Sequence, residues 1–487
     1  MKKWFKVAAV LVTFGSPSAY LAAPTTSGWC QPLMPAVAYL PPITPSHLDG
    51  VARTGVSYSL DVNFGGDVID PREFGATVGA SDSSVAVQAA INSLCSKGGG
   101  FLRFSAGEYT VHDVNVGCSS VIIAGVAPGP SKSGTLINYS SATDHAFQFR
   151  NPAFPHITQS SWLYGNGVEN LTFYSSGGST RALEFDGFYG CFVRNVFLTG
   201  SVYDGVKLYG GYKCDIEEVS TSGYVRGILT DAAVKIQGDL AGQNGTGGFC
   251  TLASCSTRVD LVSLRNLDAY GTTGSGVFIS GFVDTTIGEH LTINGMQQGL
   301  TTLCAVGFPN VAFCPAFMTF TDFETEGASN TQVNITDSSD FQCYGCYTSG
   351  NAAAVGNGVH DYLVNYRPYN TFGQGFRWIG GRISGTQYAC VAIGVSDTHI
   401  SDAYINWCNN SGKNYPGTLY TAGSQHFESN NQYCMINGTV PSQMPGTQVT
   451  APASKAQFTS NTYWGCATGL TTSGSPSDVA SVNLQGP

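Results

Sequence analysis

The sequence predicts an all-β chain folded as a parallel β-helix, and three observations lead to this prediction. A four-residue unit, reading apolar, polar, Asn or acid, apolar, returns about every 23 to 25 residues, a period typical of solenoids. The flanks of this unit alternate between apolar and polar residues, as strands do. The chain also holds 61 glycines but only 11% charged residues, which suits many short strands and turns.

The repeated unit predicts a tight bend between two short strands. Its third residue, the bend residue, is Asn, Glu, His or Asp, and Asn and Asp tolerate left-handed backbone angles. The copies are Val168–Leu171, Val193–Val196, Ile216–Val219 and Leu264–Leu267, with looser ones at Gly288–Leu291, Phe320–Phe323 and Ile400–Ala403.

Charge and hydropathy exclude several classes of partner. The net charge is −10 and the isoelectric point is about 5.2, which argues against nucleic acid or an anionic membrane surface. It argues more weakly against a polyanionic substrate, because a cleft can be locally basic. No stretch after the first 23 residues is long enough for a membrane span.

Residues 1–23 have the pattern of a secretory signal. Lys2, Lys3 and Lys6 form a basic start, followed by an apolar run and then small residues suited to cleavage. The protein is therefore predicted to be secreted or periplasmic. Residues 24–66 are Pro-rich and predict an irregular arm, 67–470 the β-helix, and 471–487 a Ser/Gly-rich tail.

The start of the predicted β-helix carries a helical pattern. Asp82–Ser84 supplies capping residues, the apolar spacing predicts a helix over about 83–96, and Gly98–Gly100 ends it. A short strand follows, then the turn Ser105–Tyr109. Such a helix covers the open strand edge of the first coil, which would otherwise promote aggregation.

This opening resembles that of the pectate-lyase-like superfamily of right-handed β-helices. The superfamily pattern is Asp-x-x-x-Phe-Gly-Ala, an Asp-rich turn, a helix ending in three glycines, and Pro-x-Gly-x-Tyr. Here Asp70–Ala76 fits the first part, whereas Ser105–Tyr109 lacks the Pro. The resemblance covers about 67–125 closely. It implies a right-handed β-helix, and it leaves function open because exo-glucanases, tailspike depolymerases, pectin-degrading enzymes and fructotransferases share it.

Fifteen cysteines predict several disulfides and at least one thiol without an intramolecular partner. Cys191 and Cys214 each lie four residues before a bend residue, so they are expected to stack on adjacent coils, about 4.8 Å apart. The pairs Cys250 with Cys255 and Cys304 with Cys314 are predicted to close local loops. Cys343 and Cys346 form a Cys-x-x-Cys without a second pair, so no zinc site, and no other metal or cofactor, is expected.

Aligning the repeats on the bend residue places three carboxylates outward. Asp268 and Glu324 lie two residues past their bends, and Glu326 lies four past. Strand spacing then separates Glu324 from Glu326 by about 6.5–7 Å, and Asp268 from Glu324 by about 9–10 Å if they are two coils apart. These separations suit inversion of a glycosidic bond with a water between the groups. The trio is predicted to lie in one groove, near the Gly-rich loop at 239–255.

Further candidates could bind sugar rings or their substituents. The exposed aromatics Tyr270 and Tyr404, the amide Asn294 and the cation Arg258 are predicted to contact substrate. Arg265 instead belongs to the column just before the bend, where acids and bases alternate from coil to coil, so it is expected to form structural ion pairs.

The function that these residues favour is that of a secreted enzyme that cuts a polysaccharide by carboxylate-based hydrolysis. The alternatives are a lyase that acts by β-elimination on a uronate polymer, and a non-catalytic surface or adhesion protein. The expected partner is a polysaccharide, and the protein is expected to be a monomer or a homotrimer.

Overall fold

The computed structural model describes residues 67–485 apart from internal gaps, and the predicted signal, the arm and the loop with Cys250 and Cys255 lie outside the described residues. The gaps are 129–133, 140–144, 153–161, 176–180, 201–202, 223–229, 239–257, 272, 307–310, 337–338, 351–358, 363–366, 369–374, 385–387, 409–414, 435–444, 451–452, 465, 467 and 474–479.

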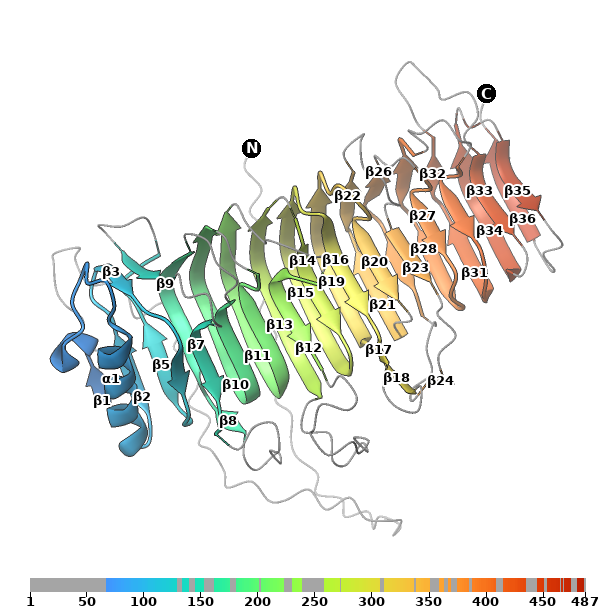
Figure 1. Ribbon diagram of the computed structural model, residues 1–487. Coiled ribbons are helices and arrows are strands. Elements are labelled where there is room, and N and C mark those ends of the chain that lie inside the picture. The colour runs from blue at the N-terminus through green and yellow to red at the C-terminus, as the bar shows by residue number, and fades with distance from the viewer. Residues whose placement is uncertain are drawn as a thin grey trace, which may run out of the picture. The chain divides into compact units, whose positions relative to one another are not determined.

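The described residues form a parallel β-helix in which each coil contributes strands to three ladders (Figure 1). We call these ladders the first, second and third faces, in the order in which a coil passes through them. Several long strands bend and continue from one face to the next. The expected fold class, an all-β parallel β-helix with a short N-terminal helix, is therefore confirmed.

The first face begins with β4 (Val114–Val116) and ends with β35 (Thr468–Ser473). Between them lie β7 (His145–Arg150), β10 (Arg181–Gly200), β11 (Val206–Ser222), β12 (Ala232–Gln237), β14 (Ser275–Ser280), β16 (Gln298–Leu303), β20 (Val333–Thr336), β23 (Val359–Tyr362), β27 (Val391–Ile393), β30 (Thr418–Tyr420) and β33 (Pro445–Thr450).

The second face begins with β1 (Asp67–Ile69) and shares β10 and β11 with the first. Its other strands are β2 (Gly100–Arg103), β5 (Val121–Ala124), β9 (Gly167–Ser175), β13 (Val259–Tyr270), β15 (Val283–Asn294), β19 (Ala316–Glu326), β21 (Ser339–Tyr344), β25 (Arg377–Ile379), β28 (Thr398–Ser401), β31 (Ser424–Ser429), β34 (Ser454–Tyr463) and β36 (Ala480–Gln485).

The third face takes the C-terminal halves of the longer second-face strands. Its own strands are β3 (Gly107–Thr110), β6 (Thr135–Asn138), β22 (Tyr347–Ser349), β26 (Arg382–Ser384), β29 (Tyr404–Asn406) and β32 (Gln432–Tyr433). Outside the three faces, β8 (Leu163–Tyr164) pairs with β10, and a small sheet joins β17 (Ala305–Val306), β18 (Val311–Phe313) and β24 (Arg367–Pro368).

Each coil turns from the second face to the third at the predicted bend residue. All seven predicted bend residues, Asn170 to Asp402, have left-handed backbone angles, with φ between 50° and 57°. The side chain of Asn195 also donates to that of Asn170 on the preceding coil, at 2.7 Å. The repeat in the sequence therefore marks a real corner, stabilised by side-chain stacking along the solenoid.

A second left-handed corner, which the sequence analysis missed, precedes the first by about five residues. Its residues have φ between 52° and 63° and share no residue type, which is why no repeat was visible. They are Lys213, Leu261, Thr285, Phe317, Asp340, Asp397, Gln425 and Lys455.

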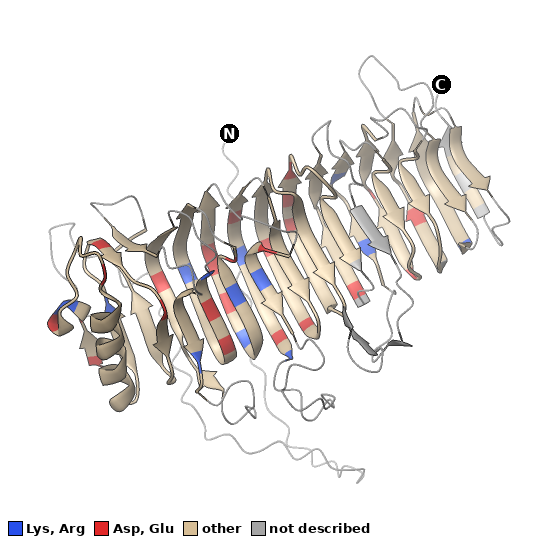
Figure 2. Cartoon of the chain, in the orientation of Figure 1, with Lys and Arg blue, Asp and Glu red and all other residues tan. Residues whose placement is uncertain are grey.

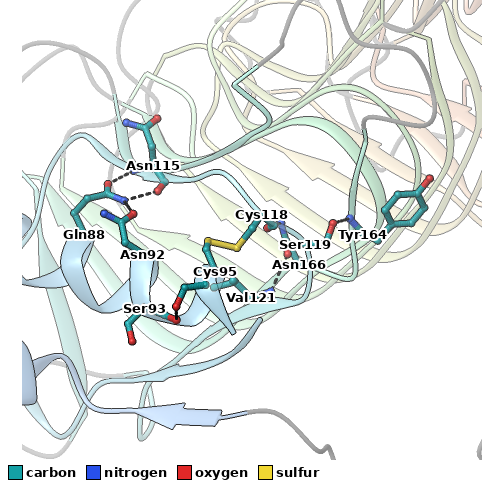
Figure 3. The surroundings of a disulfide bond; sticks show 11 residues. Gln88, Asn92, Ser93, Cys95, Asn115, Cys118, Ser119, Val121, Tyr164 and Asn166 are labelled. Atoms are coloured by element: carbon teal, nitrogen blue, oxygen red, sulfur yellow. Dashed lines mark hydrogen bonds between the residues drawn. A yellow bond between two sulfur atoms is a disulfide. The ribbon is translucent and has the colours of Figure 1, made fainter. Parts of the chain in front are cut away.

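The N-terminal coil is covered by α1 (Ser84–Ser96), as predicted. Its apolar stripe of Val87, Ala90, Ile91 and Leu94 is fully buried in the core. The disulfide between Cys95 and Cys118 ties the helix to the coil that it covers (Figure 3). Before it, η3 (Pro71–Phe74) ends at Gly75, whose φ of 97° explains the Gly of the opening motif.

The disulfides confirm the register deduced from the cysteines. Cys191 and Cys214 are paired neighbours on adjacent coils, are bonded, and have Cα atoms 4.5 Å apart. Cys304 is bonded to Cys314, as predicted, and Cys343 to Cys346. Two further disulfides, Cys390–Cys408 and Cys434–Cys466, were not predicted.

The C-terminal boundary of the solenoid differs from the expected residue 470. The first face extends through β35 to Ser473, and β36 pairs with β34 through Gln485. The Ser/Gly-rich composition of this segment suggested a tail, but short polar residues are accommodated in these last strands.

One carboxyl lies inside the solenoid core near its C-terminal end. Glu428 is fully buried and accepts hydrogen bonds from Tyr420 at 3.0 Å, Tyr433 at 2.8 Å and Thr447 at 3.1 Å. Its hydrogen-bond partners in the described residues include no cation. Burial raises the pKa of Glu428 to about 7, although these hydrogen bonds favour the carboxylate.

Ionisation of Glu428 is expected to lower the stability of the folded protein. In the unfolded chain Glu428 ionises near its ordinary pKa of 4.5, whereas in the folded protein it keeps its proton up to about pH 7. The free energy of unfolding should therefore fall by about 3 kcal/mol between pH 4.5 and pH 8. Urea unfolding across this range tests the prediction, and the fall should shrink in Glu428→Gln. An unchanged pH dependence in that variant would show that Glu428 is not the titrating group.

Candidate functional site

The three predicted carboxylates lie on the third face in the register expected from the repeat. Asp268 pairs with Thr292, which pairs with Glu324, so the two acids share a column and are two coils apart. Tyr270, Asn294 and Glu326 form the next column in the same way. At strand spacing, Asp268 and Glu324 are about 9–10 Å apart along the column. We call these two columns, from β13 to β34, the third-face columns.

The side chains of the trio are partly exposed because the strands alternate. Leu267 and Phe323 point into the core, whereas Asp268, Glu324 and Glu326 point outward and are half-buried. Glu324 and Glu326 are two residues apart on one strand, which corresponds to about 6.5–7 Å. The separation of Asp268 and Glu324 is close to the range in which two carboxyl groups can flank a sugar and a water molecule, whereas the side chains of Glu324 and Glu326 are hydrogen-bonded to each other.

Two of these acids hold their protons more tightly than usual. Burial, followed by the charge of Glu326 and a hydrogen bond to it, raises the pKa of Glu324. Burial alone raises the pKa of Asp268, whose Oδ1 has no hydrogen-bond partner among the described residues. A carboxyl group with a raised pKa can donate a proton near neutral pH, as a general acid must.

Three of the four predicted substrate contacts lie on the third-face columns. Tyr270 and Asn294 share the column of Glu326, and Tyr404 lies in the column of Glu324, three coils further along. Tyr270 and Tyr404 are each 47% exposed. Both aromatic rings are therefore open to solvent; Tyr270 is two residues from Asp268 on β13, whereas Tyr404 is about 14 Å along the column from Glu324.

Arg258 lies outside the third-face columns. Its guanidinium pairs with Asp260 at 2.9 Å and with Asp284 on the next coil. It precedes the bends at Leu261 and Asn266, so two corners separate it from Asp268. The loop at 239–255, near which the trio was predicted to lie, is outside the described residues.

Arg265 forms the structural ion pairs that its alternating column predicts. Its guanidinium lies 3.4 Å from Glu217, and Arg194 lies 3.7 Å from the same carboxylate. The three side chains belong to successive coils on the second face.

A second charged cluster, which the sequence analysis did not predict, occupies the first face. Figure 2 shows acidic and basic residues gathered on β10, β11 and their neighbours. Glu184 and Asp186 are fully buried there. We call this group the first-face cluster; it comprises Gln148, Arg150, Arg181, Glu184, Asp186, Asp204, Lys207 and Lys235.

Every cation of the first-face cluster is paired with a carboxylate. Lys207 lies 2.7 Å from Glu184, Arg181 lies 3.0 Å from Glu184, and Lys235 lies 3.3 Å from Asp204. Arg150 contacts Asp186 at 2.5 Å. This arrangement is a network of ion pairs in which the carboxylates are more deeply buried than the cations, and Oδ1 of Asp186 has no hydrogen-bond partner among the described residues.

The two buried acids of this cluster have opposite pKa shifts. Burial opposes ionisation of Glu184, but Lys207, Arg181 and Arg150 together lower its pKa to about 2. Burial and the adjacent charge of Glu184 raise the pKa of Asp186, and Arg150 opposes that rise. The surrounding cations therefore favour the ionised form of Glu184.

The cluster escaped sequence analysis because its strands follow loops of variable length. Aligning the repeats on the bend residue gives the register of the strands on the second and third faces. The first face follows a further turn, so this alignment does not give the register of its strands. One signal was present: Leu183, Glu184, Phe185 and Asp186 alternate as a strand, and Val206-Lys207-Leu208 repeats the alternation one coil later.

Within the described residues, no group of three or more His, Cys, Asp or Glu side chains is placed to hold a metal ion. None of the described helices has the length and apolar character needed to cross a membrane.

Comparison with known proteins identifies the fold. Tailspike protein 3 of bacteriophage CBA120 superposes with a TM-score of 0.54 at 11% identity, over 85% of this chain and 61% of the tailspike chain. The chain thus spans less than two thirds of the tailspike. The catalytic domain of a GH87 α-1,3-glucanase in complex with nigerose superposes with a TM-score of 0.48 at 12% identity. The match covers 83% of this chain and 68% of the glucanase chain.

The A-module of a mannuronan C-5 epimerase from Azotobacter vinelandii gives a TM-score of 0.45 at 14% identity, over 86% of this chain and 99% of the module. No protein-family model and no curated protein matches the chain. The likeness to the tailspike shows the fold alone, and the protein is a right-handed parallel β-helix, as expected.

Proposed function

We propose that this protein is a secreted enzyme that cuts a polysaccharide by hydrolysis of glycosidic bonds on its third face. The observation that carries the proposal is the placement of Asp268, Glu324 and Glu326 in two adjoining outward columns. The fold does not choose among functions, so the proposal rests on this surface.

Glu324 is the candidate general acid of the reaction. Its raised pKa keeps a proton available for the oxygen of the scissile glycosidic bond. As the bond between that oxygen and the anomeric carbon breaks, the proton moves from Glu324 to the leaving sugar, and positive charge develops on the ring. The neighbouring carboxylates stabilise that charge.

Glu326 or Asp268 is the candidate general base. Either carboxylate would take a proton from a water molecule while the water oxygen bonds to the anomeric carbon. The separation of about 9–10 Å between Asp268 and Glu324 leaves room for this water and predicts inversion at the anomeric centre. Tyr270 and Asn294 stand on the same columns and would hold the sugar through its ring face and hydroxyl groups.

Secretion and a polysaccharide partner fit the remaining features. The described residues carry six disulfides, a density typical of oxidising compartments. The solenoid offers a continuous outward surface along the third face, which suits a long chain as substrate.

A panel of soluble polysaccharides tests the reaction type. Hydrolysis predicts new reducing ends without absorbance near 235 nm, and inverted configuration of the first product by proton NMR. A simultaneous rise of reducing ends and of 235 nm absorbance would replace hydrolysis by β-elimination. Binding without either signal would favour a non-catalytic surface or adhesion protein.

A further inference from the structure

Two tryptophans are exposed near the C-terminal end of the third face. Trp407 is 51% exposed and Trp464 is 55% exposed. Tryptophan is on average one of the more buried side chains, so two open indole rings on a solenoid suggest a surface kept for a ligand. Tyr404, at 47% exposure, lies on the same coil as Trp407.

The register places these rings on the proposed catalytic surface. Glu326 pairs with Ser349, then Ser384, then Asn406. Tyr433 pairs with Ile405 on the preceding coil and with Tyr463 on the following coil. The residue after Tyr463 therefore continues the column of Asn406, the residue after Ile405. Trp464 therefore lies in the column of Glu326, and Trp407 directly follows Asn406 at its border. Figure 1 shows β22, β26 and β32 of this face one after another along the solenoid.

The spacing of the aromatic rings suits an extended ligand that lies along the solenoid axis. Trp464 is two coils beyond Asn406, or about 10 Å at strand spacing. Five coils, or about 24 Å, separate it from Glu326. A chain bound over the carboxylates and continued along the column would reach both indoles.

The side chains between the rings are polar but carry no charge. From Tyr404 onward, the partly exposed residues of the described third-face columns are Gln432 and Thr462, whereas Asn406 is 9% exposed and Cys434 is buried in its disulfide with Cys466. The nearest charge in these columns is Arg382, which precedes Tyr404 and donates to Asn406 at 3.2 Å. Sugars combine apolar C–H faces, which pack on aromatic rings, with hydroxyl groups, which bond to amides and hydroxyls. A protein partner would instead favour a contiguous apolar patch.

We propose that Tyr404, Trp407 and Trp464 form an anchoring surface for the polysaccharide, remote from the bond that is cut, and that it binds neutral sugar units. This inference rests on the proposed function, because it assumes that the chain over the carboxylates is a polysaccharide. It further fixes the direction of the bound chain: along the solenoid axis, across at least five coils.

Affinity gel electrophoresis tests the anchoring surface without requiring turnover. The probes are soluble dextran, hydroxyethyl cellulose, xylan, alginate and polygalacturonate, each cast into the gel. We expect the full-length protein to be retarded by at least one of them. The double variant Trp407→Ala with Trp464→Ala should bind that polysaccharide at least 10-fold more weakly, because both rings project into solvent and contribute little to folding.

Two controls separate this proposal from the proposed chemistry. Phe317→Ala removes an equally exposed ring, 53% exposed at the other corner, and should leave retardation unchanged. Glu324→Gln should abolish cutting but keep binding. The anchoring surface is refuted if no probe retards the wild-type protein, or if the double variant binds as the wild type does. Loss of binding in the double variant with full activity in Glu324→Gln would instead refute the catalytic role alone.

Discussion

Glu324→Gln is expected to lower turnover by about 100-fold or more on any polysaccharide that the wild-type protein cuts. Gln has nearly the same shape but cannot donate a proton to the leaving oxygen, so the loss should appear in kcat while KM changes little. Rates of reducing-end release at saturating substrate measure the effect. Near-normal turnover would remove Glu324 from the mechanism and direct attention to basic residues and β-elimination.

A matched substitution shows whether this effect is specific to the site. Glu289 is an exposed glutamate on the second face, just before its bend residue, and Glu289→Gln should leave turnover unchanged. Both variants remove one exterior charge from the same solenoid. A similar loss of turnover in both variants would mean that the net charge of the protein, rather than proton donation by Glu324, determines the rate.

The pH profile gives an independent test of the same assignment. A general acid works only while protonated, so activity should fall as the pH rises through the pKa of Glu324. Glu326 contributes to raising that pKa, and its removal in Glu326→Gln should move the alkaline limb of the profile to lower pH. A limb that stays in place would show that the two carboxyl groups are not coupled.

Glu184→Gln is expected to destabilise the folded protein by about 3–5 kcal/mol, the largest stability effect among these predictions. Glu184 is fully buried and balances Lys207 and Arg181, so its neutralisation leaves Lys207 without its carboxylate and Arg181 with only its 3.5 Å contact to Asp204. Chemical unfolding followed by circular dichroism measures the loss. The control Glu217→Gln, on the partly exposed pairs with Arg194 and Arg265, should cost only about 0–1 kcal/mol.

The pH dependence of stability should report the same buried pair. The folded pKa of Glu184, about 2, lies below the ordinary 4.5, so its stabilisation is present above pH 4.5 and is lost as the pH falls toward 2. This acid-side loss should be smaller in Glu184→Gln. Equal stability of the variant and the wild type would mean that the first-face cluster contributes little to folding.

The sequence predicts those parts of the fold that repeat at a fixed distance from one recognisable residue. The bend residue fixed the second and third faces, and with them the stacking of Cys191 on Cys214 and the column of Asp268 and Glu324. Five of the seven left-handed bend residues at this corner are Asn or Asp, so a pattern shows. The other corner has the same left-handed angles but holds Lys, Leu, Thr, Phe, Asp or Gln, so it left no pattern.

Features that depend on several coils at once were not predictable. Glu184, Lys207 and Arg150 meet only because three first-face strands align after loops of different length. Arg258 lies away from the third face because its two partners, Asp260 and Asp284, lie on adjacent coils before the corner rather than after it. Trp464 joins the column of Glu326, and Trp407 borders it, only through pairings that the interrupted later repeats conceal.

The position of an oligosaccharide bound to Glu324→Gln tests the central claim most directly. The inactive variant would be crystallised with the longest product of the polysaccharide that the wild-type protein cuts. The account predicts sugar density over Asp268, Glu324 and Glu326, with the scissile linkage beside residue 324 and the chain directed along the third-face columns toward Trp464. Density over the first-face cluster, at Glu184 and Asp186, would contradict it.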